Sequence, residues 1–219
     1  MSAASGVFVT GTGTEVGKSV VAAVVARTAA AQGRSVAVFK PAVSGLDEGG
    51  EADHELLRRA AGSSQSDAEI APYRFGPPLS PHLAAELAGE PISTERLRAV
   101  AAAAARGADL LVCEGVGGLL VPLSDTYLVR DLAVELGYPV IVVASPGLGT
   151  INHTLLTLES ARGAGLELRA VVLNPWPPQP GRIELSNRET IARLGRVEVL
   201  TLPELDLGDP GSWPALPLA

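Results

Sequence analysis

A glycine-rich segment between an apolar run and a helix-like run is the feature that most constrains the fold. The segment from Gly11 to Ser19 reads GTGTEVGKS and follows the apolar residues 7–9. Five residues separate Gly11 from Gly17, one more than in the usual P-loop pattern. A strand, a glycine turn and a helix in this order predict a loop whose N–H groups wrap phosphate at a helix N-terminus. The alternative is an ordinary glycine-rich turn.

Lysine is rare in this chain, and its positions are informative. There are two lysines, Lys18 in the glycine-rich segment and Lys40 at the end of the apolar run 36–39, against fifteen arginines. Lysine is a compact point charge with three donors, whereas arginine is a wide planar fork. We therefore expect ammonium chemistry at both strand ends. Codon bias would explain the many arginines but not the places that the lysines keep.

Bulk properties narrow the class of protein. A length of 219 residues with 47% hydrophobic content allows a full core, and we expect one domain over residues 1–219. The net charge of -7 argues against nucleic-acid binding. The single Cys113 excludes an internal disulfide and fits a reducing compartment. No apolar stretch is long enough to span a membrane, and residues 1–6 lack a signal-peptide pattern, so we expect a cytoplasmic protein.

Short β-type runs alternate with longer helical runs along the chain. This alternation predicts an α/β fold of the P-loop NTPase type, with a mostly parallel sheet of six or seven strands and helices on both faces. The segment 63–81 is expected to be a loop or lid-like excursion, and the proline-rich tail after 203 to be irregular. The expected strands are 7–10, 36–39, 109–113, 139–144, 168–173 and 196–200. The expected helices are 18–32, 53–61, 93–106, 127–137, 150–164 and 183–194.

Two acidic residues could complete a magnesium site beside the Ser19 hydroxyl. Glu114 ends the apolar run 110–113 and leads into a glycine loop. Asp53 opens a predicted helix. Mg²⁺ prefers oxygen ligands and takes one or two carboxylates together with phosphates. Alternatively, Glu114 is an exposed strand-end residue and Asp53 a helix N-cap.

Four motifs in register resemble those of the dethiobiotin synthetase family. They are Val9 to Ser19, Lys40 to Gly45, Glu114 to Gly118 and Gly149 to His153. The resemblance implies a P-loop NTPase fold and a homodimer. It also implies an ATP-dependent ligase of biotin biosynthesis, which closes the ureido ring of dethiobiotin from 7,8-diaminopelargonate and CO₂. The reaction would pass through a carbamate and a carbamic–phosphoric mixed anhydride, with ATP as co-substrate and Mg²⁺ as cofactor.

The resemblance also implies roles for individual residues. Lys18 and Lys40 would be catalytic, and Ser19, Asp53 and Glu114 would bind the metal. The nucleotide-binding residues would be Thr14, Glu15, Val16, Gly17, Lys18, Ser19, Val20, Asp53, Glu114, Gly115, Val116, Gly117, Asn174, Pro203, Glu204 and Leu205. The substrate-binding residues would be Thr14, Lys40, Ser44, Gly149, Thr150, Ile151 and Asn152.

In that family the turn 149–152 reaches the active site from the partner subunit, so the substrate site would be shared across the dimer interface. Its N–H groups would bind the carboxylate at the far end of the substrate. Alternatively, Thr150 or Asn152 only caps the helix. Gly147 departs from the family pattern, because some members have a lysine there.

Two other functions compete with the ligase. A partitioning or site-selection ATPase would usually carry a second lysine early in the P-loop, and residues 11–13 have none. An amide-forming synthetase acting on a corrinoid acid would usually carry an added glutaminase domain, for which 219 residues leave no room.

Overall fold

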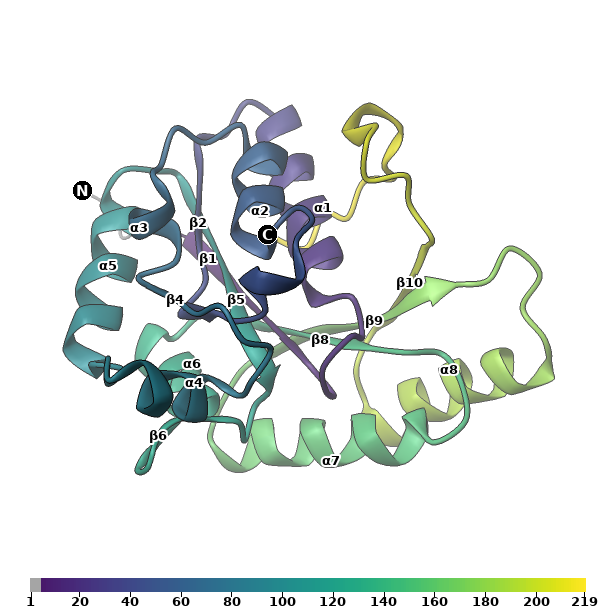
Figure 1. Cartoon of the computed structure of the whole chain (residues 1–219). Helices are drawn as coiled ribbons and strands as arrows, with labels where there is room; N and C mark the ends of the chain where they lie inside the picture. Colours follow the sequence, from purple (N-terminus) through teal and green to yellow (C-terminus); the bar gives the residue numbers. More distant parts are fainter. Residues whose placement is uncertain (1–4) are drawn as a thin grey trace.

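Six parallel strands form the central sheet of the computed structural model, which describes residues 5–219 (Figure 1). In chain order they are β1 (Ser5–Gly11), β2 (Val36–Phe39), β5 (Leu110–Gly118), β8 (Val140–Ala144), β9 (Leu168–Trp176) and β10 (Val199–Pro203). They lie in the order β10-β9-β8-β1-β5-β2. The predicted α/β architecture is confirmed. Residues 1–4, on which the expectation about a signal peptide partly rests, lie outside the described residues.

Helices and two small strand pairs complete the structure. The helices are α1 (Lys18–Ala31), α2 (Asp53–Ala61), α3 (Asp67–Ile70), α4 (Pro81–Ala88), α5 (Thr94–Arg106), α6 (Val129–Leu136), α7 (Thr150–Gly163) and α8 (Arg182–Gly195). Two 3₁₀ turns span Leu46–Glu48 and Pro210–Ser212. The small pairs are β3 (Ala42–Val43) with β4 (Tyr73–Arg74), and β6 (Pro122–Ser124) with β7 (Tyr127–Leu128). Within residues 5–219, no helix has both the length and the apolar character needed to cross a bilayer.

The strands are apolar on both sides because helices cover both faces of the sheet (Figure 1). Val7 and Val9 pack with α1 and α2 in one core, and Phe8 between them packs in the other core with α5 to α8. The tail after β10 returns to the α1 face, where Trp213 and Leu216 are buried. Helix α1 is rich in Ala and Val because it is covered by the sheet, by α2 and by this tail.

The topology places the glycine-rich segment at the centre of one sheet edge. β1 lies between β5 and β8, and β2 lies beyond β5. The chain therefore leaves β1 and crosses over β5 before it returns in β2. Because all six strands run parallel, the residues that follow β1, β2 and β5 meet at their carboxyl ends, where α/β sheets bind ligands.

Several local predictions were wrong at this level. The segment 63–81 is not a simple loop, because it contains α3 and β4, and α4 begins at Pro81. The helix predicted over 127–137 begins at Val129, after a short hairpin. β5 continues through its glycines to Gly118, which pairs with Gly11 of β1 and so keeps these glycines in the sheet. The last strand covers Val199–Pro203 rather than 196–200.

The ring of Tyr138 packs so closely against β1 that it leaves no room for a side chain at Gly6. A Cβ added at Gly6 would come within 2.6 Å of the ring atoms Cδ1 and Cε1. We predict that Gly6→Ala lowers the free energy of unfolding by about 1–3 kcal/mol, the usual cost of overpacking. Denaturant unfolding measures this loss. In a Tyr138→Ala background the ring is absent, so the same substitution should cost clearly less. Equal costs in both backgrounds would contradict the contact.

Candidate functional site

A cavity of about 620 Å³ opens at the carboxyl ends of β1, β2 and β5. It contains both lysines of the chain and the two acidic residues expected to bind magnesium, Asp53 and Glu114. Its lining consists of Thr14, Glu15, Gly17, Lys18, Ser19, Val20, Lys40, Ala42, Ser44, Glu48, Glu51, Asp53, Leu56, Glu114, Val116, Gly117 and Leu207. The convergence of these charged groups makes this cavity the candidate site.

The phosphate-type loop is shaped by Gly17, a position where any larger residue would be strained. Gly17 has a φ of 83°, and a Cβ there would lie 1.9 Å from Nδ2 of Asn174. The same Asn174 nitrogen donates to the carbonyl of Val16 at 3.3 Å. The loop is thus supported from behind by the end of β9. Lys18 donates from Nζ to the carbonyl of Gly13 at 2.9 Å, which folds the ammonium group back over its own loop.

Ser19, Lys40, Asp53 and Glu114 form one closed network in the cavity. The Ser19 hydroxyl lies 2.8 Å from Oδ1 of Asp53 and 2.8 Å from Oε1 of Glu114. The Lys40 ammonium lies 2.7 Å from Oδ2 of Asp53 and 2.6 Å from Oε1 of Glu114. Glu114 is fully buried, whereas the Asp53 side chain is 45% exposed. The network therefore has one closed end in the core and one end open to solvent.

Burial and charge shift the pKa values of these groups in different directions. Burial lowers the pKa of Lys18. Burial would also lower the pKa of Lys40, but the carboxylates of Glu114 and Asp53 outweigh it and raise that pKa. Burial raises the pKa of Glu114, and the adjacent Lys40, which lowers it, only partly offsets this effect. Burial opposes the Asp53 charge as well, yet Lys40 and Ser19 hold the pKa of Asp53 below its usual value.

The same oxygens suit a magnesium ion. The Ser19 hydroxyl lies within hydrogen-bond distance of both carboxylates, and one hydroxyl with two carboxylates is the protein share of a typical Mg²⁺ site. Oε2 of Glu114 is buried and has no hydrogen-bond partner among the described residues, so it is available to a further cation. The residues present therefore fit the expected ion.

Some predicted site residues lie outside the cavity lining. Val16 packs into the core below the loop, and Gly115 is buried against Phe8 and Val129. Asn174 lies behind the loop rather than on the cavity surface. Residues 203–205 follow β10 and do not line the cavity either.

The turn 149–152 also lies outside the cavity of its own chain. Gly149 has a φ of 93°, and Thr150 begins α7 with its side chain buried. The buried Thr150 hydroxyl lies 3.4 Å from that of Thr154, within the helix. Neither Thr150 nor Asn152 precedes the helix, so the N-cap position belongs to Gly149 rather than to either of them.

Five residues of the cavity lining were not among the predicted site residues: Ala42, Glu48, Glu51, Leu56 and Leu207. Glu48 and Glu51 lie in the glycine-rich stretch between β3 and α2, and Leu207 comes from the tail. The acidic, glycine-containing stretch 47–51 could have indicated Glu48 and Glu51, because a turn soon after Lys40 can bring its side chains back toward that lysine. Leu207 had no local signal, since its place depends on the return of the tail, where its carbonyl accepts a hydrogen bond from Arg59.

Comparisons with known proteins agree with one another. A family model described as an AAA domain matches residues 5–210. The ATP-dependent dethiobiotin synthetase BioD of Anaeromyxobacter dehalogenans (strain 2CP-1 / ATCC BAA-258) is 45% identical over 197 residues, covering 90% of this chain and 88% of the relative. The protein of that name from Rhodococcus erythropolis (strain PR4 / NBRC 100887) is 41% identical and covers 89% and 86%. The chain belongs to the dethiobiotin synthetase family.

Further similarities support this membership and the fold. A dethiobiotin synthetase from Mycobacterium sp. (strain KMS) is 46% identical over 195 residues, covering 86% of this chain and 83% of the relative. The kinase domain of the Escherichia coli tyrosine kinase ETK superposes with a TM-score of 0.51 at 19% identity, over 81% of this chain and 69% of that domain. The second similarity concerns the fold alone. Membership in the dethiobiotin synthetase family favours the ligase over the two competing functions.

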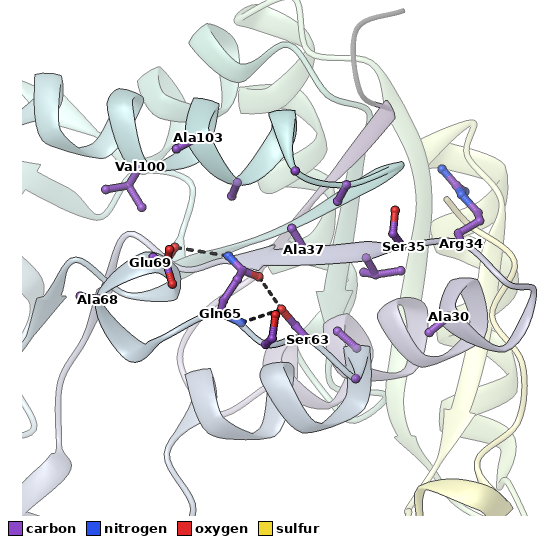
Figure 2. A pocket seen from close by; sticks show the side chains of 17 residues that line it. Ala30, Arg34, Ser35, Ala37, Ser63, Gln65, Ala68, Glu69, Val100 and Ala103 are labelled. Carbon is purple, nitrogen blue, oxygen red and sulfur yellow. Dashed lines mark hydrogen bonds between the residues drawn. The ribbon is translucent and has the colours of Figure 1, made fainter.

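A second cavity, of about 660 Å³, lies at the free edge of β2 and contains none of the family's motif residues. Figure 2 shows its alanine-rich walls and the side chain of Gln65 across its floor. Oε1 of Gln65 accepts from the N–H of Val38 at 2.8 Å, and Nε2 donates to the Val38 carbonyl at 3.1 Å. The cavity lining includes one acidic residue, Glu69, and one basic residue, Arg34. It therefore lacks the converging charges of the first cavity.

The buried pair of Lys40 and Glu114 should be costly to break. We predict that Lys40→Met lowers the free energy of unfolding by about 3 kcal/mol at neutral pH, because it leaves a buried carboxylate without its cation. Denaturant unfolding measures the loss. In a Glu114→Gln background the same change should cost less, since no buried charge is then left unpaired. A loss that is independent of residue 114 would contradict the pairing.

Proposed function

We propose that the chain closes the ureido ring of dethiobiotin from 7,8-diaminopelargonate, CO₂ and ATP. Family membership already makes it an ATP-dependent enzyme of the dethiobiotin synthetase class, a ligase of biotin biosynthesis. The proposal adds the reaction course and the residues. The observation that carries it is the meeting of Lys18 and Lys40 with Ser19, Asp53 and Glu114 in the cavity that the phosphate-type loop lines.

The reaction brings together two anions, a carbamate and the γ-phosphoryl group of ATP, whose charge must be neutralised. One amine adds CO₂ and becomes a carbamate. A carbamate oxygen then takes the γ-phosphoryl group of ATP, forming a carbamic–phosphoric anhydride and releasing ADP. The second amine attacks the carbamate carbon, the ring closes and phosphate leaves. No nucleophilic side chain is needed, so the protein contributes positioning and charge stabilisation.

The two lysines would provide that charge stabilisation. Residues 14–20 would wrap the triphosphate, and Lys18 is the cation among them. Lys40 reaches the cavity from β2, with Ser44 beyond it. Lys40 is buried and its raised pKa keeps it charged at neutral pH, so it suits a carbamate or phosphate oxygen. A buried cation acts more strongly on such an anion than one in water.

Ser19, Asp53 and Glu114 would hold Mg²⁺ in this proposal. Bound there, the ion would neutralise phosphate oxygens and both carboxylates. The unpartnered Oε2 of Glu114 and the short Ser19 contacts support this assignment. The chain's own contribution is to fix these oxygens on three separate elements, α1, α2 and β5.

We also propose a homodimer in which the turn 149–152 serves the partner's cavity. The turn does not line the cavity of its own chain, so an isolated chain would lack a group for the substrate carboxylate. The adjacent Leu148 is 95% exposed, and Leu156 of α7 is 56% exposed. Apolar side chains this exposed beside a functional turn fit an interface between two copies.

Nucleotide-base contacts by Asn174 and residues 203–205, and further phosphate contacts by residues 115–117, belong to the same proposal. So does a single domain over residues 1–219, supported by the tail that packs Trp213 and Leu216 against α1. A cytoplasmic location would fit the single cysteine.

The test of the reaction is ATP turnover by the purified chain with Mg²⁺, bicarbonate and 7,8-diaminopelargonate. We expect ADP release to depend on the diamine and to match the ring-closed product one to one. Lys18→Ala should lower turnover by about 10²-fold or more, as for other charge-stabilising groups. ATP hydrolysis at the same rate without the diamine would contradict the ligase and favour a nucleotide switch.

Complementation tests the shared site. Lys18→Ala removes the phosphate lysine, and Gly149→Asp places a strained, negatively charged residue at the proposed carboxylate turn. Each variant alone should be inactive. Mixed in equal amounts and allowed to exchange subunits, half of the dimers are mixed and carry one intact site, so about a quarter of the wild-type activity should return. Activity no higher than that of the separate variants, despite proven exchange, would contradict a site built from two chains.

A further inference from the structure

Asn187 on α8 holds the loop that leads into the proposed carboxylate turn. Its side chain donates from Nδ2 to the carbonyl of Pro146 at 2.8 Å and to the carbonyl of Gly147 at 3.0 Å. Asn187 is 7% exposed, so this contact is largely shielded from water. Both partners are carbonyls, which only accept, so the amide nitrogen must face them. One amide group thus uses both of its N–H bonds on two consecutive peptide units.

The Gly147 carbonyl also accepts from the N–H of Thr150 at 3.3 Å, whereas the Pro146 carbonyl has Asn187 as its partner. Together these hydrogen bonds fix the direction of the N–H groups in the same peptide units. The N–H of Gly147 shares a planar unit with the Pro146 carbonyl, and the N–H of Leu148 shares one with the Gly147 carbonyl. Both units are trans, because the one cis bond among residues 5–219 is Asn174-Pro175. In a trans unit the N–H points opposite to the C=O. Both N–H groups are therefore directed away from α8.

The outward side of this loop is open. Neither the N–H of Gly147 nor that of Leu148 donates to an acceptor among the described residues. Leu148 itself is 95% exposed. The N–H groups of Ile151 and Asn152 in the first turn of α7 have no helical partner either. Within residues 5–219, the loop N–H groups of Gly147 and Leu148 are thus free donors beside the free N–H groups at the start of α7.

We propose that Asn187 is a positioning residue that turns the Gly147 and Leu148 N–H groups toward the substrate carboxylate. The inference rests on the proposed function, in which this turn binds that carboxylate. Asn187 would not touch the substrate. It acts by holding the two carbonyls inward, so that the loop presents its donors without having to reorganise when the anion arrives.

The test compares two substrates that differ at the far end of the chain. One is 7,8-diaminopelargonate, and the other is 2,3-diaminononane, which keeps the vicinal amines and carries a methyl group in place of the carboxylate. For each variant, kcat/KM for 7,8-diaminopelargonate is divided by kcat/KM for 2,3-diaminononane. This ratio reports recognition of the carboxylate. In Asn187→Ala we expect this ratio to fall about tenfold. KM for ATP and turnover of 2,3-diaminononane should stay near wild type.

Two further variants separate positioning from a general packing defect. Asn187→Asp keeps the shape of the side chain but cannot donate when ionised, so its ratio should fall at least as far. Arg188→Ala is the matched control. Arg188 lies next on α8, and its Nε donates to the Val199 carbonyl at 3.4 Å, away from the loop. Its ratio should remain that of the wild type.

The outcomes separate this inference from the proposed function. A wild-type chain without diamine-dependent turnover would overturn the proposed reaction, and one that turns over both substrates without preferring the acid would overturn the carboxylate turn. A wild-type preference that survives in Asn187→Ala and Asn187→Asp would overturn the role of Asn187 alone. An equal loss of kcat/KM for both substrates would show that Asn187 has only a structural role. Should Asn187→Ala fail to fold, Asn187→Ser retains one donor and should give an intermediate ratio.

Discussion

The site depends on one buried contact, the ammonium group of Lys40 against the carboxylate of Glu114. Glu114 is fully enclosed within β5, directly after the residue that pairs with Phe39, and its charge could not be kept there without a cation beside it. Lys40 provides that cation from the neighbouring strand, and Asp53 and Ser19 complete the circle from two helices. The parallel register of β2 and β5 thus determines the chemistry, because it brings the two strand ends to the same edge.

Much of this arrangement could be predicted from the sequence. The continuous apolar runs identify strands that are buried on both faces, and strand–helix alternation predicts a parallel sheet. The residues at the strand ends then fall on one edge, which brings Lys18, Lys40 and Glu114 together without any knowledge of side-chain contacts. Asp53 could be placed only through the family resemblance, because an acidic residue at a helix start is equally well explained as a cap.

What could not be predicted depends on long-range packing. The hairpin 122–128 and helices α3 and α4 lack strong periodicity, and their places are set by the elements around them. Leu207 reaches the cavity only because the tail folds back over α1. Asn187 has no motif around it, since its role comes from a contact with residues about forty positions earlier. Such contacts leave no local trace in a single sequence.

The Gln65 side chain has a consequence for assembly. A strand at the margin of a sheet carries open donors and acceptors, onto which another chain can add. Gln65 matches both groups of Val38 with its amide, and the N–H of Lys40 is taken by the Ile70 carbonyl. This margin is therefore closed by residues of its own chain. Another chain could therefore not extend the sheet through this part of β2, and the closed margin is protected from fibril-like growth.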